Sequence, residues 1–555
     1  MNTSQMLIGL FGGLGLFLYG MKLMGDGLEN AAGDRLKGFF EKVVSNPYKG
    51  ILIGTIVTAI IQSSSATTVM VIGFVNAGLM NLYQAAGVIM GANIGTTVTG
   101  QLVALDLAAI APVFVGIGAL IVLFSKGDKR REIGNIILGF GILFIGMQSM
   151  SGAMKPLAKS EGFVSLIATL SFNPILGVLV GLVLTAIIQS SSATMAILIT
   201  LANTGLIPLV VALPVLFGNN IGTCATALLS SIGTNKNARK AALIHMIFNL
   251  VGTVIFLIIL KPVSNLILTI SPSDVGKQIA NAHTLFNVTN VIIQAPFIKY
   301  LVALVNKLIP SDIEEENPAI LYLDDRLLET PVIAVGQCSK EIGRMGEKAR
   351  EILVLAVESI ETGDENLIKK VGEGEDLVDL LEEEITKFLV KLSNTELSKQ
   401  QVDKVTSMFH VVNDIERIGD HAKNIANLST EKIAKKLTFS EEAQTELNEM
   451  YKYTLKALDT SIESFEKNDV KLASTVIDIE DKIDAFQEKL RDNDIKRLNT
   501  SRCEARVSAI YLDIISNFER VGDHSLNVAE AVIRVNKLFV SEAAATQVKN
   551  IKDNE

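Results

Sequence analysis

Long apolar runs fill the first 310 residues of this 555-residue chain, and the remaining residues follow a different pattern. A helix rises ~1.5 Å per residue and a bilayer core is ~30 Å thick, so runs of about 20 residues can cross it. Candidate spans lie at about residues 5–24, 108–124, 133–150, 241–260 and 284–305. From about residue 331 the apolar positions recur with heptad-like spacing, which indicates amphipathic helices packed in a bundle. The pattern predicts an all-α chain, with a polytopic membrane domain over 1–310 followed by a helical bundle.

The ten-residue sequence TAIIQSSSAT occurs twice within the apolar part, at 58–67 and at 185–194. The same offset of 127 relates GANIGTTVT from residue 91 to GNNIGTCAT from residue 218, and an offset of 126 relates GLFLYGMKLM to GILFIGMQSM. A constant offset over this length indicates a duplicated unit, with repeats at about 5–105 and 133–235. Membrane domains built from such repeats are typical of transporters.

The polar centre of each repeat predicts a re-entrant helical hairpin rather than a crossing helix. The apolar run at 51–61 is too short to cross, and the serines that follow it compete for backbone hydrogen bonds and loosen a helix. The basic loops at 125–132 and 235–240 are expected in the cytoplasm by the positive-inside bias. With one crossing, 108–124, between the copies, the repeats would be inverted. The N-terminus is then expected outside the cell membrane and the C-terminal domain in the cytoplasm.

The two polar centres predict a binding site for an anion together with a cation. Helix ends at mid-membrane leave N–H groups unpaired, and helix N-termini attract anions. No Lys, Arg, Asp or Glu occurs at 51–105 or 172–232, so a co-bound cation would be held by carbonyl and hydroxyl oxygens, which suit sodium. Repeat-related polar groups extend the candidate site to Asn93, Thr96, Asn220 and Thr223. Packing of small residues at helix crossings is the alternative explanation for all of these positions.

The doubled Gln-Ser-Ser-Ser motif resembles the mark of the type II sodium-phosphate cotransporters, over about residues 1–310. The resemblance implies coupled transport of inorganic phosphate and sodium ions. It also implies a shared site lined by Gln62, Ser63, Ser64, Ser65, Gln189, Ser190, Ser191 and Ser192, with Thr67 and Thr194 closing the motif in each copy. The large extracellular loop of the animal members is missing, so the chain looks like a bacterial-type member.

A few other polar residues stand out in the membrane part. His and Asn lie four residues apart at 245 and 249, and again at 283 and 287. We expect each set to pack helices through a hydrogen-bonded pair rather than to bind protons or substrate. Asp106 is expected in an outer loop. The three cysteines are far apart in sequence and favour a reduced compartment over a disulfide framework.

Charge separates the two parts of the chain. Residues 1–310 hold 18 Lys and Arg against 9 Asp and Glu, whereas residues 311–555 hold 32 against 50, which indicates an acidic soluble domain. We expect a linker at 311–330, the soluble domain at 331–540 and a tail at 541–555. Within the domain, HVVNDIERIGDHAKNIA from residue 410 matches YLDIISNFERVGDHSLNVA from residue 511, which predicts two three-helix units.

Paired acids in this domain predict a metal site. Glu and Asp four residues apart share a helix face, so carboxylates of neighbouring helices would meet and would favour a di- or trivalent metal. The candidate ligands are Glu375, Asp379, Glu416, Asp420, Glu480, Asp484, Glu519 and Asp523. A solvated charged face neutralised by Arg417 and Arg520 is the alternative.

The Glu-Arg-Ile-Gly-Asp-His motif of this domain resembles PhoU, a phosphate-signalling regulator, over about residues 325–540. The resemblance implies two three-helix bundles, metal clusters on the Glu-x-x-x-Asp pairs and regulation of phosphate uptake. The combined hypothesis is a sodium-coupled phosphate transporter with a cytoplasmic regulatory domain. Its partners would be phosphate, sodium, lipid and, through the bundle, a signalling protein or a second copy of the chain.

Other function classes fit the sequence less well. A membrane phosphate sensor without net transport and an anion channel remain as alternatives. An enzyme is not expected, since the chain has no nucleophile with His and acid partners, no Walker loop and no Cys/His metal spacing. No nucleic-acid partner is expected either.

Overall fold

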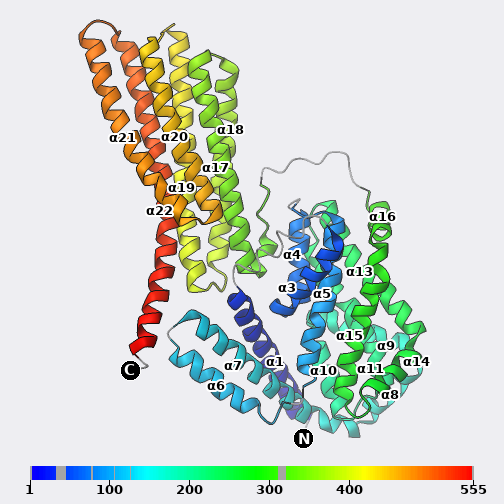
Figure 1. Ribbon diagram of the computed structural model, residues 1–555. Helices are drawn as coiled ribbons and strands as arrows, with labels where there is room; N and C mark the ends of the chain where they lie inside the picture. The colour runs from blue at the N-terminus through cyan, green and yellow to red at the C-terminus, as the bar shows by residue number, and fades with distance from the viewer. Residues whose placement is uncertain are drawn as a thin grey trace. The chain divides into compact units, whose positions relative to one another are not determined.

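The computed structural model describes residues 3–32, 46–76, 79–105, 107–125, 127–310 and 320–552, so Asp106 and the linker residues 311–319 lie outside the described residues. Every regular element in those ranges is a helix, which confirms the all-α prediction (Figure 1). The chain divides into two compact units, Met1–Glu316 with Asp324–Ile333, and Asn317–Leu323 with Ala334–Glu555. We call them the membrane unit and the bundle unit.

The membrane unit contains helices that are long and apolar enough to cross a bilayer. Five described stretches meet this requirement: Ser4–Ala32, Arg130–Leu157, Leu209–Ser230, Lys236–Ile258 and Val275–Leu308. A bent pair, α8 (Glu161–Phe172) with α9 (Pro174–Ile188), would make a sixth. The expected crossing at 108–124 corresponds to α6 (Ala111–Phe124), whose 14 residues extend only ~21 Å. This helix is shorter than a ~30 Å core, and the inverted arrangement of the repeats stays a prediction.

The sequence repeat reappears in the order and length of the helices. α3 (Pro47–Ile61) and α4 (Ser64–Asn76) recur 127 residues later as α9 and α10 (Ser191–Asn203). α5 (Leu82–Val103) recurs as two helices, α11 (Leu209–Gly222) and α12 (Cys224–Ser230). The first helices of the repeats are α1 (Thr3–Ala32) and α7 (Asp128–Met154), and they pack closely along each other at glycines. The unit is completed by α13 (Lys236–Ile258), α14 (Leu260–Ile270), α15 (Val275–Gln294) and α16 (Ile298–Leu308).

Each Gln-Ser-Ser-Ser segment begins where a helix ends in a left-handed residue. Gln62 follows α3 with φ 60° and Gln189 follows α9 with φ 56°, a region that non-glycine residues seldom adopt. The Oγ1 atoms of Thr58 and Thr67 then lie 3.0 Å apart, although these residues are nine positions apart. In a continuous helix nine positions span ~13.5 Å along the axis. The chain therefore reverses direction, and α3 and α4 form a hairpin.

The second copy repeats the reversal and both hairpins dock in the same way. Thr185 and Thr194 bring their Oγ1 atoms to 3.1 Å, as the equivalent of the Thr58–Thr67 contact. A Cβ atom on Gly54 of α3 would lie 2.2 Å from the carbonyl oxygen of Val88 in α5, and the repeat-related contact in the second copy is equally close. Because no side chain fits there, glycine fixes the first hairpin against α5 and the second against α11.

The bundle unit consists of two sets of three helices, as the sequence repeat predicts (Figure 1). The sets are α17 (Pro331–Thr362), α18 (Glu365–Ser393) and α19 (Lys399–Ala434), then α20 (Glu441–Lys467), α21 (Val470–Asn499) and α22 (Ala505–Lys552). Their aliphatic stripes are buried, as at Ile385, Ile415 and Ile483. α22 continues through most of the residues expected as a tail. α17 begins in the membrane unit, at Pro331, and enters the bundle unit at Ala334.

Candidate functional site

Both serine-rich hairpin tips line a single cavity of the membrane unit. The cavity has a volume of about 250 Å³, and its wall includes 62–65 of the first motif and 189–192 of the second. Helix α1 supplies Lys22, Asp26 and Glu29, and a segment beyond the membrane helices supplies Glu329. The eight Gln and Ser residues of the two motifs, separated by 127 positions in sequence, are thus brought together in space.

Two helix N-termini open into this cavity. Ser63 and Ser190 precede α4 and α10, and their Oγ atoms accept hydrogen bonds from the N–H groups of Ala66 and Ala193, at 3.1 and 3.2 Å. These caps satisfy one N–H of each helix and leave the N–H groups of the first two residues, which line the cavity, without intrahelical partners. Exposed N–H groups and the positive end of the helix dipole favour an anion.

The serine side chains differ in what they already bind. Among the described residues, the hydroxyls of Ser64, Ser191 and Ser192 have no hydrogen-bond partner. The Oγ atom of Ser65 accepts from Thr226 Oγ1 at 3.3 Å, which connects the two repeats directly. Three hydroxyls are therefore available to a ligand without breaking an existing bond.

The two glutamines, although related by the repeat, are used differently. Gln62 is buried, and its side chain donates to the carbonyl oxygen of Ala59 at 2.5 Å and accepts from Thr99 Oγ1 at 2.9 Å. These bonds join the first hairpin to α5. Gln189 is exposed to the cavity and keeps its amide free of such bonds within the described part of the chain. The amide of Gln189 is the better candidate for contact with a ligand.

The charged residues of α1 are functional candidates that lie outside the repeated motifs. Lys22, Asp26 and Glu29 share one face of the helix, because positions four and seven apart lie above one another. Because Lys22 lines the cavity, an anion there would meet a positively charged side chain as well as hydroxyl and N–H groups. The signal was present in the sequence, since ionisable residues in an otherwise apolar helix are costly and mark functional sites.

The remaining predicted ligands lie outside the main cavity. Thr67 and Thr194 are fully buried in the hairpin contacts described above. The buried amides of Asn93 and Asn220 donate to carbonyl oxygens of their own helices, at Ile89 and Leu216, and Thr223 does the same at Asn220. Thr96 lies in a neighbouring narrow cleft with Thr99, Ser191, Ser192 and His283.

The two His-Asn sets do not pair as expected. The Asn249 and Asn287 amides donate to the backbone carbonyl oxygens of His245 and His283, at 3.1 and 3.0 Å, rather than to the rings. His283 Nε2 instead lies 3.3 Å from Asn220 Oδ1, which joins α15 to α11. His283 thus packs α15 against α11 through a hydrogen-bonded pair, as expected, with Asn220 as its partner. A side-chain amide four residues along a helix reaches the backbone carbonyl more readily than the ring.

In the bundle unit the second set of acids forms a compact cluster. Carboxylate oxygens of Glu480, Asp484 and Asp523 all lie within 4.8 Å of one another. Burial and the neighbouring Asp484 and Asp523 carboxylates raise the pKa of Glu480 to about 7. Glu519 is paired with Arg520 at 3.6 Å, and burial and Asp523 raise its pKa. Three mutually repelling carboxylates fit a hard cation, whose charge would relieve the repulsion.

The first set of acids is partly neutralised by basic residues of the chain itself. Lys423 Nζ forms an ion pair with the buried Glu375 at 2.6 Å. Burial and the Asp420 carboxylate raise the pKa of Asp379 and of Glu416, while Arg417 pairs with Asp420 at 3.1 Å. The residue equivalent to Lys423 in the second repeat is Leu526. The two clusters therefore differ by one positive charge.

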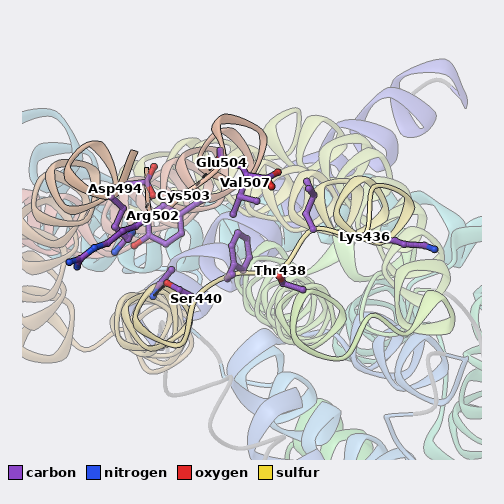
Figure 2. A pocket seen from close by; sticks show the side chains of 13 residues that line it. Lys436, Thr438, Ser440, Asp494, Arg502, Cys503, Glu504 and Val507 are labelled. Carbon is purple, nitrogen blue, oxygen red and sulfur yellow. Dashed lines mark hydrogen bonds and ion pairs between the residues drawn. The ribbon is translucent and has the colours of Figure 1, made fainter. Parts of the chain in front are cut away.

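The bundle unit also contains a cavity of about 200 Å³ at the ends of α19 and α21 (Figure 2). Asp494, Arg502 and Cys503 lie at one end of it and Lys436 at the other. Arg497 is buried in its wall, where it pairs with Glu446 at 2.7 Å and with Asp494 at 3.3 Å. Two carboxylates therefore already balance the Arg497 guanidinium, which holds α20 and α21 together.

Comparison with known proteins agrees with these features. The Na+/Pi-cotransporter family profile matches residues 16–152 and 145–271, and the PhoU domain profile matches 342–429 and 447–532. "Putative inorganic phosphate export protein YjbB" of Salmonella typhimurium is 24% identical over 95% of this chain and 97% of its own length. YqeW of Bacillus subtilis is 33% identical over 47% of this chain and 85% of its own length. "Phosphate-specific transport system accessory protein PhoU homolog 1" of Thermotoga maritima is 32% identical over 35% of this chain and 84% of its own length.

The duplicated hairpins and their shared cavity define a membrane protein of the repeat-built type, joined to a helical bundle. The chain belongs to the Na+/Pi-cotransporter family and carries PhoU domains in its C-terminal part.

Proposed function

We propose that the chain is a sodium-coupled secondary transporter of inorganic phosphate in the cell membrane. The observation that carries the proposal is the cavity shared by the two Gln-Ser-Ser-Ser tips, with its unpaired helix N-termini and free hydroxyls. Membership of the Na+/Pi-cotransporter family and the name of the full-length relative YjbB support phosphate as the substrate. The volume of about 250 Å³ is below the ~300–1,000 Å³ of sites for drug-sized ligands and suits a small ion.

Phosphate would be held by partners that match its charge and shape. The N–H groups at the starts of α4 and α10 and the hydroxyls of Ser64, Ser191 and Ser192 donate hydrogen bonds to its oxygens. Lys22 supplies a full positive charge from α1. Hydrogen bonds to a charged partner are stronger than those between neutral groups, so these donors together would hold a doubly charged ion.

Sodium would bind beside the phosphate, in the cavity that Asp26 and Glu29 line together with the serines. Hard cations prefer oxygen ligands, and carboxylates and hydroxyls supply them here. Sodium then reduces the repulsion between the carboxylates and phosphate, and phosphate in turn favours sodium. This reciprocal effect on binding is the coupling that a symporter needs.

Alternating access would come from motion of one repeat against the other around the shared cavity. In this proposal the N-terminus is outside, the bundle is cytoplasmic, and the bundle regulates the flux. A di- or trivalent metal at Glu480, Asp484 and Asp523 would hold α21 and α22 together and set the state of the bundle.

Purified protein in liposomes tests the proposal. An imposed sodium gradient should drive accumulation of radiolabelled phosphate, and Ser64→Leu or Ser191→Leu should abolish it while the variant still inserts and elutes as a folded protein. Phosphate flux that ignores the sodium gradient would indicate a channel. Phosphate binding without any flux would indicate a sensor.

A further inference from the structure

A short segment between the last membrane helix and the bundle reaches the cavity. Residues Asp324–Ile333 belong to the membrane unit, and we call them the strap. The strap includes the 3-10 turn η3 (Asp325–Glu329) and the first residues of α17. The sequence predicted this segment only as the end of a linker.

The strap is fastened to the ends of helices from both repeats. Asn76, the last residue of α4, donates to Asp324 Oδ2 at 2.9 Å, and Arg326 Nε donates to the carbonyl oxygen of Ser230, the last residue of α12, at 2.8 Å. Asp324 and Arg326 form an ion pair at 2.6 Å, which joins the two anchors. Leu327 is fully buried against Gly73 of α4. Movement of the strap away from these helices would break its contacts with Asn76, Ser230 and Gly73.

The strap carries a carboxylate to the cavity wall. Glu329, the last residue of η3, lines the cavity together with the serines of both tips. Its carboxylate has no hydrogen-bond or ion-pair partner among the described residues. The N–H group of Val332, one turn further on, donates to Glu29, which lines the same cavity. The strap is therefore bound on both sides of Glu329. The Glu329 carboxylate lines the same cavity as the N-termini of α4 and α10, which favour anions.

We propose that Glu329 competes with the incoming oxyanion, and that the docked strap holds the transporter in a state of low turnover until the bundle releases it. This inference rests on the proposed function. A like charge in the cavity disfavours bound phosphate, and its effect is strongest where little water screens it. The strap also connects α4 with α12, elements of different repeats that must move relative to each other in alternating access. Because α17 starts in the strap and continues into the bundle unit, a rearrangement of the bundle acts on the strap directly.

The charge of Glu329 is tested with Glu329→Gln in proteoliposomes. Removing the carboxylate should lower the KM for phosphate about tenfold, the size expected for loss of one like charge at partly screened range. Asp325→Asn is the matched control, since it removes the same charge from the same turn at a residue that does not line the cavity. Equal KM values for Glu329→Gln, Asp325→Asn and the unmodified chain would overturn the role of Glu329.

Release of the strap is tested by locking it in place. Asn76→Cys with Asp324→Cys replaces the contacting pair, in a Cys503→Ser background because Cys224 and Cys338 are buried. Oxidation should reduce phosphate flux to background, and a reductant should restore it, whereas each single cysteine variant should be insensitive. Full flux in the crosslinked protein would overturn the release step. Absence of flux in the unmodified chain would instead contradict the proposed function, so the two failures are distinguishable.

Discussion

Ser191→Ala offers the sharpest test of the binding site, because the substitution deletes a hydroxyl that could bind the ligand and leaves the packing of the helix intact. Its hydroxyl lines the cavity and has no partner among the described residues, and its backbone is the first residue of α10. Substitution therefore strands no buried group, and Ala is a good residue in a helix. We expect the free energy of unfolding to change by no more than ~0.5 kcal/mol.

The effect on transport should be large by comparison. A hydrogen bond to a charged partner contributes ~1.5–3 kcal/mol, and each ~1.4 kcal/mol is a factor of ten. We therefore expect kcat/KM for phosphate to fall roughly 10- to 150-fold. The assay is initial uptake of radiolabelled phosphate into proteoliposomes below KM, with thermal stability measured on the same preparation. A stable Ser191→Ala protein with unchanged kcat/KM would refute the assignment of this hydroxyl to the ligand.

Thr194→Val should lower the stability by ~1–3 kcal/mol with little change in the KM for phosphate, because the Thr194 hydroxyl is hydrogen-bonded to Thr185 and does not line the cavity. Thermal unfolding measures the effect on stability, and uptake kinetics measure the effect on KM. Lys22→Met should raise the phosphate KM and weaken its dependence on ionic strength, and an unchanged salt dependence would contradict a role for this charge. In the metal-free chain the pKa of Glu480 is raised from 4.5 to about 7. Between these two pH values the folded bundle keeps a proton that the unfolded chain has released, so the free energy of unfolding falls as the pH rises from 4.5 to about 7. Mg²⁺ or Mn²⁺ should therefore stabilise the bundle more at pH 8 than at pH 6. The measurement is the rate at which a thiol reagent modifies buried Cys338 in a Cys224→Ser, Cys503→Ser background. Glu480→Gln should remove the difference between the two pH values.

The helical hairpins could be predicted from sequence because their signals are local. A Gln and three Ser in an apolar stretch break a helix, and the offset of 127 residues marks both copies. Even the lengths of the helices before and after each break are the same in the two copies. Which residues of the repeat face a ligand was not predictable in the same way. Asn93 and Asn220 are as polar as the serines, but their amides bond carbonyl oxygens of their own helices.

The missed parts of the site depend on contacts between distant segments. Lys22 and Glu29 become part of the cavity only because α1 lies beside both tips, which no local pattern indicates. Glu329 is more than a hundred residues from both Gln-Ser-Ser-Ser segments in sequence. It reaches the cavity through the anchors at Asn76 and Ser230. The periodicity of a sequence predicts which face of a helix is buried, but it does not predict which other element packs against that face.

The ion pair between Lys423 and Glu375 makes the two halves of the bundle unequal despite their common ancestry in sequence. In the first half the Glu375 carboxylate has a lysine of the same chain as its counter-ion, so this carboxylate needs no cation from the solution. The second half has Leu526 in place of that lysine, and its three clustered carboxylates lack this partner. We therefore expect the charge of the second half to depend more strongly on the concentration of protons or metal ions than the charge of the first.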